Sequence, residues 1–267
     1  MNKKVVFYGG GNMAEGILKC LLKKGVFQAE DITIAEVVPA RREYLTETYQ
    51  LKAVADASAE IKDADIVIIA VLPSMIADIS AKLKDLLKDG AIVISIAAGI
   101  SIHVIEEQLK PESKTVRIMP NTLSQSGNGY SALCINQYCT DEDKAFIEEI
   151  VSSLGQVMYL SDDMFNLFSA FSCTGPLWVY KTIEALINAG VHSGFSRTAS
   201  RDIVIKNMIG AAMVLDMSGD HPAARIDQMT SPAGSTIEAL TVLEEEAFAS
   251  AILKSVAASV DKTNSLK

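Results

Sequence analysis

The chain has 267 residues, of which 49% are apolar and 21% are charged. At about 100 to 200 residues per domain, this length predicts one large domain or two ordinary ones with a sizeable core. The net charge of −9 is spread along the sequence without a basic stripe, which argues against a nucleic-acid partner or an anionic membrane surface.

The sequence predicts neither a membrane segment nor a metal site. Its longest apolar runs, 66–72 and 91–100, are far shorter than the roughly 18 to 20 residues that a membrane helix requires. The first residues do not resemble a signal peptide. The four cysteines form no C-x-x-C pair and the three histidines lie far apart. We therefore expect reduced thiols, no bound metal and a cytoplasmic location.

The first half of the chain alternates short apolar runs with segments of helical period, which is typical of β-α-β units. Residues 4–8 predict the first strand, and residues 12–24 predict a crossover helix that Gly25 caps. Further strands are predicted at 31–36, 66–71, 91–96 and 116–119. Because the third and fourth strands are almost continuously apolar, we expect a doubly wound parallel sheet of the Rossmann type with helices on both faces.

Beyond about residue 156 the pattern becomes helical, after one last strand predicted at 157–160. Long helices are predicted at 164–189, 198–217 and 244–264. They are apolar on more than one side, so we expect them to pack against a second copy of the chain. The sequence therefore predicts an α/β domain at 1–161 and an all-helical domain at 162–267 that forms a homodimer or a higher oligomer.

A glycine-rich turn joins the first strand to the first helix. Gly9, Gly11 and Ala14 match the pattern G-x-G-x-x-A. In this pattern the first glycine makes the tight turn, the second lets the main chain approach a pyrophosphate, and the small third residue packs the helix on the strand. The amides at the helix start, at Asn12 and Met13, then point at the anion. The alternative is a plain flexible connection, but both flanks favour dinucleotide binding.

The end of the second strand bears on the choice between NAD(H) and NADP(H). An acid here pairs with the ribose hydroxyls of NAD(H), whereas a basic residue accepts the 2′-phosphate of NADP(H). Glu36 favours NADH, but Arg41 and Arg42 follow on the next predicted helix. These arginines either reach a phosphate or merely solvate a helix face. The sequence leaves the coenzyme preference undecided.

Three further stretches combine glycine, proline and small hydroxyl residues between predicted elements, where main-chain amides can bind a ligand. They are Arg117-Ile118-Met119-Pro120-Asn121-Thr122, Ser172-Cys173-Thr174-Gly175-Pro176-Leu177-Trp178 and Met229-Thr230-Ser231-Pro232-Ala233-Gly234-Ser235-Thr236. Together with the glycine-rich turn and with Ser95-Ile96-Ala97-Ala98-Gly99-Ile100, they resemble the pyrroline-5-carboxylate reductase family. The motifs follow the family's order at comparable spacing over essentially the whole chain.

The resemblance implies an oxidoreductase that uses NAD(P)H to reduce the cyclic imine of 1-pyrroline-5-carboxylate to L-proline, the last step of proline synthesis. It implies a carboxylate site at Ser231, Gly234 and Ser235, largely through amides, and a contact of the catalytic Thr236 hydroxyl with the ring nitrogen. A hydroxyl suits this role because it can donate or accept as the nitrogen changes from iminium to amine. The family's other sites imply substrate contacts at Gly175 and Pro176, and coenzyme contacts at Ala70, Val71, Pro73, Ala97, Pro120 and Asn121. These coenzyme contacts add to those that the glycine-rich turn and the second strand end predict at Gly9, Gly11, Asn12, Met13 and Glu36.

The chain departs from the family's usual residues at several of these positions. Leu72 stands where lysine is usual, Ala233 replaces the first glycine of the substrate loop, and residues 173–178 are bulkier than the usual Gly-Ser-Gly-Pro-Ala-Tyr. Reduction of another cyclic imino acid, such as a piperideine carboxylate, and a non-catalytic nucleotide-binding paralogue are therefore alternatives. A hydroxy-acid dehydrogenase is a third alternative, with Lys181 as the nearest catalytic lysine.

Overall fold

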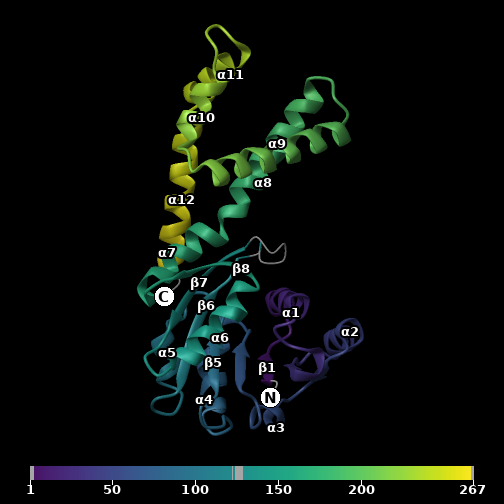
Figure 1. The fold of residues 1–267 in the computed structure, drawn as a ribbon, viewed down its shortest axis with the longest axis vertical. Coiled ribbons are helices and arrows are strands. Elements are labelled where there is room, and N and C mark those ends of the chain that lie inside the picture. The colour runs from purple at the N-terminus through teal and green to yellow at the C-terminus, as the bar shows by residue number, and fades with distance from the viewer. Residues whose placement is uncertain (1–2, 122, 124–128, 266–267) are drawn as a thin grey trace. The chain divides into compact units, whose positions relative to one another are not determined.

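The computed structural model describes residues 3–121, 123 and 129–265. The chain forms two compact units, one of residues 1–173 with 262–267 and one of residues 174–261. The first unit contains a sheet covered by helices, and the second is helical (Figure 1).

The sheet has the strand order β3-β2-β1-β4-β5-β6-β7-β8. Each neighbouring pair is parallel except β6 and β7, which are antiparallel. The order reverses between β1 and β4, as in dinucleotide-binding folds. The strands are β1 (Val5–Tyr8), β2 (Ile32–Ala35), β3 (Lys52–Val54), β4 (Ile66–Ile69), β5 (Ile92–Ser95), β6 (Lys114–Met119), β7 (Gly129–Ile135) and β8 (Gly155–Tyr159). The predicted Rossmann-type fold is confirmed, with one antiparallel pair in an otherwise parallel sheet.

Alternate residues of the central strands face two separate buried clusters, one on each face of the sheet. On β1, Val5 and Phe7 belong to one cluster and Val6 to the other. All residues of β4 and β5 are buried, which explains their continuous apolar sequence. The first cluster includes residues of α1 (Asn12–Lys24), α2 (Pro39–Tyr49) and α6 (Asp141–Ser152), and the second includes residues of α3 (Ser58–Ile61), α4 (Ile76–Leu83) and α5 (Ile102–Glu106).

The first helix follows its prediction from end to end. It begins at Asn12 and ends at Lys24, and Gly25 adopts the left-handed conformation with φ 71°. The Gly25 amide donates to the carbonyl oxygens of Leu21 and Leu22, which satisfies groups that the helix end leaves without partners.

Several elements differ from the predictions. The sequence does not predict β3, which has three residues, or β7, which opens with the non-aliphatic run Gly129-Tyr130-Ser131. The predicted helix 164–189 is interrupted: a 3-10 turn (Asp162–Met164) precedes α7 (Phe165–Phe168) and a π-helical turn (Ser169–Cys173), and α8 begins at Gly175. Pro176 has no amide hydrogen, so one continuous ladder cannot run through it. The predicted helix 244–264 begins only at Phe248, because the chain turns at Ala247 with φ 53°.

The second unit consists of helices with much exposed apolar surface. They are α8 (Gly175–His192), α9 (Arg197–Ser218), α10 (Pro222–Met229), α11 (Ser235–Glu245) and, up to residue 261, α12 (Phe248–Asn264). α8 and α9 pack closely at Gly190, where a Cβ would lie 2.7 Å from Ser200 Oγ. Exposed apolar side chains include Tyr180, Phe195, Met213, Met217, Met229 and Leu253. Such a surface is typical of a subunit interface. Of the helices in the described ranges, none combines the length and the apolar character needed to cross a membrane.

Candidate functional site

The coenzyme residues expected from the sequence follow the carboxyl ends of the parallel strands. Gly9 follows β1, Glu36 follows β2, Ala70 follows β4, Ala97 lies just beyond β5 and Pro120 follows β6. The carboxyl ends of parallel strands meet at one edge of a sheet, and doubly wound folds bind ligands there, where the strand order reverses. The structure therefore brings these segments to one edge of the first unit. Val71 and Pro73, which follow Ala70, lie in the same connection.

The glycines of the turn after β1 have two different roles. Gly9 has φ +105°, and a Cβ there would lie 2.5 Å from the carbonyl oxygen of Ala70. A Cβ at Gly10 would lie 2.7 Å from Leu45 Cδ1. A Cβ at Gly11 would meet no described atom within 4 Å, so this residue borders open space. The fold therefore requires the first two glycines, whereas the third leaves room for a ligand.

The start of α1 is arranged to bind an anion. Gly11 is the N-cap and has no side chain that accepts a hydrogen bond from the first-turn amides, which include those of Asn12 and Met13. These amides and the helix dipole favour a negative charge. Ala14 is 1% exposed and packs in the buried cluster, as expected for the small third residue of the pattern.

Two main-chain amides hold the Glu36 carboxylate. Gly10 N donates to Oε2 at 3.0 Å, and Val38 N donates to Oε1 at 2.9 Å. The carboxylate therefore lies between the glycine-rich turn and the start of α2. An acid at this place is positioned as in folds that bind the ribose hydroxyls of a dinucleotide.

Both arginines of α2 form hydrogen bonds within the chain. Arg41 donates from Nε to the carbonyl oxygen of Gly10 at 2.7 Å and from Nη2 to Glu15 Oε2 at 2.6 Å. Arg42 donates from Nη1 to the carbonyl oxygens of Glu36 at 2.7 Å and Val37 at 2.9 Å. Neither arginine merely solvates a helix face.

Glu15 is a residue that the sequence reasoning missed. It is 8% exposed, it accepts hydrogen bonds from Arg41, Tyr44 and Tyr49 of α2, and Lys19 Nζ lies 2.9 Å from it. Burial alone would raise the pKa of Glu15, but the hydrogen bonds from Tyr49, Lys19, Arg41 and Tyr44 lower it to about 2. Burial and the bond to Glu15 raise the pKa of Tyr49 to about 12. The sequence did contain a signal for this residue. Glu15 is an acid in the first turn of a helix whose start is predicted to bind an anion, and its charge beside that anion requires a cation nearby.

The π-helical turn at 169–173 holds the segment after β6. Cys173 Sγ donates to the carbonyl oxygen of Pro120 at 3.7 Å, and Asn121 Nδ2 donates to Ser172 Oγ at 3.3 Å. Turns of this kind are frequent at functional sites. Burial raises the pKa of the Cys173 thiol, which favours the protonated form. Thr122, which completes this motif, lies outside the described residues.

A buried arginine of β6 forms an ion pair with a half-buried aspartate. Arg117 is 2% exposed, and its Nη1 donates to Asp162 Oδ1 at 2.8 Å. Its guanidinium carbon lies 4.4 Å from the centroid of the Phe165 ring. Asp162 also accepts a hydrogen bond from Ile102 N at 3.2 Å. The pair therefore joins β6 to the start of α5 and to the turn that follows β8.

In the second unit, the expected substrate loop makes a tight turn before α11. Gly234 N donates to the carbonyl oxygen of Ser231 at 3.0 Å, and a Cβ on Gly234 would overlap the Ser231 hydroxyl. Ala233 has φ 57°, the left-handed region that favours glycine. Gly234 is the N-cap of α11, and Ser235 and Thr236 are the first two residues of this helix. The amides of this turn are therefore placed at a helix start, where an anion binds favourably.

Gly175 and Pro176 are the first two residues of α8. Proline suits this position, because first-turn amides have no partner within the helix. A Cβ on Gly175 would meet no described atom within 4 Å, whereas Pro176 is buried. Nearby, Trp178 Nε1 donates to Ser255 Oγ at 2.9 Å, which ties α8 to α12.

The residues that other chemistries would need are not arranged for them. Lys181 is 71% exposed, and its Nζ lies 2.5 Å from Glu184 Oε2 in an ion pair within one helix. Within the part of the chain that the structure describes, no group of three His, Cys, Asp or Glu side chains is placed to hold a metal ion.

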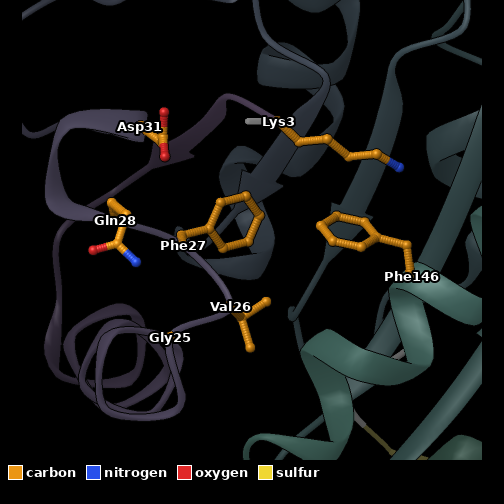
Figure 2. Close-up of a pocket in the computed structure, with 7 residues that line it drawn as sticks. All are labelled: Lys3, Gly25, Val26, Phe27, Gln28, Asp31 and Phe146. Carbon is orange, nitrogen blue, oxygen red and sulfur yellow. The ribbon is translucent and has the colours of Figure 1, made fainter. Parts of the chain in front are cut away.

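A hollow of about 300 Å³ in the first unit lies apart from the predicted site residues (Figure 2). It is lined by Lys3, Gly25, Val26, Phe27, Gln28, Asp31 and Phe146. The Phe27 and Phe146 rings meet edge to face with centroids 5.8 Å apart, and Lys3 Nζ lies 4.0 Å from the Phe146 centroid. These contacts pack Phe146 of α6 against the loop after α1 and against the residues before β1.

Two family models match the chain. Residues 162–266 match the model described as pyrroline-5-carboxylate reductase dimerisation. Residues 4–99 match the model described as NADP oxidoreductase, coenzyme F420-dependent.

Similar proteins match over the full length of the chain. It is 32% identical over 269 residues to a pyrroline-5-carboxylate reductase of Synechocystis, covering all of this chain and 99% of the relative. It is 30% identical to the pea (Pisum sativum) pyrroline-5-carboxylate reductase, covering 97% and 94% of the two chains. A solved pyrroline-5-carboxylate reductase of Coxiella burnetii superposes with a TM-score of 0.89 at 28% identity, over 100% and 99% of the chains. A Plasmodium falciparum pyrroline carboxylate reductase with NADP bound superposes with a TM-score of 0.88 at 26% identity, over 99% and 98%.

Proposed function

Because the chain belongs to the pyrroline-5-carboxylate reductase family, we propose that it reduces 1-pyrroline-5-carboxylate to L-proline with NAD(P)H. One observation carries the proposal: a single chain combines a glycine-rich turn between β1 and α1, at the carboxyl edge of the sheet, with a helical region that matches the family's dimerisation model. We assign the coenzyme to a dinucleotide-binding domain at 1–161, and the substrate and the subunit contact to a helical domain at 162–267.

The coenzyme pyrophosphate is proposed to bind the amides at the start of α1. The open space beside Gly11 and the first-turn amides of Asn12 and Met13 support this assignment. Further coenzyme contacts are proposed at Gly9, Glu36, Ala70, Val71, Pro73, Ala97, Pro120 and Asn121.

The substrate carboxylate is proposed to bind Ser231, Gly234 and Ser235, with Gly175 and Pro176 as further contacts. The tight turn at 231–234 and the helix start at Ser235 support this assignment, because amides there form an anion site without a full positive charge.

The Thr236 hydroxyl is proposed to contact the ring nitrogen. NAD(P)H, when bound, supplies the hydride that adds to the carbon of the C=N bond. The chain's own residues have to position the ring and stabilise the nitrogen as it takes up the electron pair of that bond. A protonated imine is already electrophilic, so positioning does most of the work. This explains a site with a hydroxyl rather than a strong general acid.

We propose further that two copies associate through the helical domain, as a homodimer or a higher oligomer, in the cytoplasm. The exposed apolar side chains of α8 to α12 support association. Sedimentation at micromolar concentration tests it, and a monomer under those conditions contradicts it.

The activity is tested by following reduced-nicotinamide absorbance with pyrroline-5-carboxylate and with its six-membered analogue, each with NADPH and with NADH. Turnover of the five-membered ring is the expected result. Turnover of the larger ring alone would assign a piperideine carboxylate as substrate, and coenzyme binding without turnover of either ring would indicate a non-catalytic paralogue.

The role of Thr236 is tested with Thr236→Val, which removes the hydroxyl and keeps the side-chain shape. We expect kcat/KM to fall by about tenfold or more, with Thr236→Ser retaining most of the activity. The matched control is Thr241→Val, which removes a hydroxyl that only bonds the Ile237 carbonyl oxygen on the same helix. Equal kcat/KM in wild type and Thr236→Val would remove Thr236 from the site.

A further inference from the structure

The loop that follows β2 carries a fixed negative charge. Glu36 accepts hydrogen bonds from two main-chain amides, those of Gly10 and Val38, through its two carboxylate oxygens. The carboxylate cannot turn away without losing both bonds. In dinucleotide-binding folds the ribose 2′ position lies at this strand end. A 2′-phosphate would therefore approach a carboxylate that cannot move aside, whereas a 2′-hydroxyl can donate to it.

Arg41, the first of the two candidate phosphate ligands, already has two partners within the chain. Its Nε bonds the Gly10 carbonyl oxygen and its Nη2 bonds Glu15, at 2.7 and 2.6 Å. Turning it toward a phosphate would break both bonds, and the Glu15 carboxylate, which is 8% exposed, would keep only the ion pair with Lys19 of the two that it makes among the described residues. Tyr44 and Tyr49 also donate to Glu15, so the carboxylate itself is held in place.

Arg42 is the remaining cation of the segment. Its Nη1 is shared between the carbonyl oxygens of Glu36 and Val37. These bonds hold the guanidinium against the main chain of the two residues that follow β2. Moving Nη1 to a 2′-phosphate would break both of them.

From these contacts we infer that the enzyme discriminates in favour of NADH over NADPH, and that Glu15 is a positioning residue for this choice because it holds Arg41 away from the 2′ position. The inference rests on the proposed coenzyme site and goes beyond the assignment to NAD(P)H. Glu36 disfavours the 2′-phosphate of NADPH through its negative charge. Glu15 acts indirectly, because its ion pair with Arg41 keeps that arginine from binding the phosphate.

The test is calorimetric titration of the full-length oligomer with NADH and with NADPH, without substrate. We expect wild type to bind NADH about tenfold or more tightly than NADPH, with a preference that declines as salt rises. In Glu15→Gln, Arg41 is no longer paired with a charge, so the affinity for NADPH relative to NADH should rise by about threefold or more. The double variant E15Q/R41A should lose this gain, because the released cation is absent.

Two further variants separate charge from structure. Tyr44→Phe removes one hydrogen bond to Glu15 and leaves the Arg41 contact, so the ratio of the two affinities should stay at the wild-type value. Glu36→Gln keeps an acceptor for Gly10 N and removes the negative charge, so the relative affinity for NADPH should rise by about tenfold. Glu36→Gln therefore tests the inference even if the Glu15→Gln protein does not fold.

The outcomes distinguish the inference from the proposed function. Equal or tighter binding of NADPH by wild type would overturn the inference alone, and so would a ratio unchanged in both Glu15→Gln and Glu36→Gln. A protein that binds neither coenzyme would overturn the proposed function and the inference with it.

Discussion

Glu15 makes the free energy of unfolding of the first unit depend on pH. The isosteric substitution Glu15→Gln removes this dependence and so measures the contribution of Glu15 alone. The pKa of Glu15 is about 2 in the folded protein, against an ordinary value of 4.5. At about 1.36 kcal/mol per unit, ionised Glu15 contributes about 3 kcal/mol to folding at pH 7. A folded-state pKa below the unfolded one means that this contribution is complete above pH 4.5 and is lost as pH falls toward 2. It should be about 2.5 kcal/mol at pH 4 and about 1.5 kcal/mol at pH 3.

The assay compares urea unfolding of wild type and Glu15→Gln at pH 7, 4 and 3, at one fixed protein concentration because association also stabilises the fold. The difference in the free energy of unfolding should narrow as pH falls, because protonated Glu15 then resembles glutamine. Glu47→Gln changes an exposed acid on α2 and serves as the control, with a difference near zero throughout. A wild-type advantage that is absent at pH 7, or that stays constant down to pH 3, would refute the reasoning.

Four other substitutions test the site and its support. Gly9→Ala should lower the free energy of unfolding by about 1 to 3 kcal/mol, because of the positive φ and the overlap with the Ala70 carbonyl oxygen. Gly11→Ala should keep the thermal midpoint of the wild type and weaken coenzyme binding in calorimetry. Asp162→Asn should lower the free energy of unfolding by about 3 kcal/mol, since Arg117 is 2% exposed and loses its charged partner; an unchanged urea midpoint would contradict this. Lys181→Ala should leave both kcat/KM and stability near wild type, because its ion pair with Glu184 is exposed. A large loss of turnover would instead favour a hydroxy-acid dehydrogenase with Lys181 as its catalytic lysine.

Elements with strong local signals were predictable from the sequence. The first helix has its glycine cap in the left-handed conformation, and the apolar runs at 66–71 and 91–96 contain the fully buried strands β4 and β5. Elements that depend on distant partners were not predictable. β7 is a strand because it pairs with β6 on one side and β8 on the other, and no local apolar run announces its start.

Some features of the candidate site were likewise predictable from the sequence, and others were not. The carboxyl-edge positions of Gly9, Glu36 and Pro120 follow from the β-α-β order, because each stands at the end of a predicted strand or directly after it. The state of Arg41 does not follow, since its partner Glu15 lies 26 residues earlier and the contact depends on how α2 packs beside α1. A charge on a helix is therefore visible in the sequence, while the group that neutralises it is visible only in the fold.

Ala233 places main-chain strain in the loop proposed to bind the substrate. Its φ of 57° lies in the left-handed region, where an alanine is roughly 1 to 2 kcal/mol less stable than in an ordinary conformation. Such a conformation persists only where its surroundings impose it. Here Pro232 fixes one main-chain torsion before it, and the hydrogen bond from Gly234 N to the Ser231 carbonyl oxygen closes the turn around it. Replacing Ala233 with glycine would therefore relieve strain in the folded loop, and the same change would enlarge the set of conformations open to the unfolded chain.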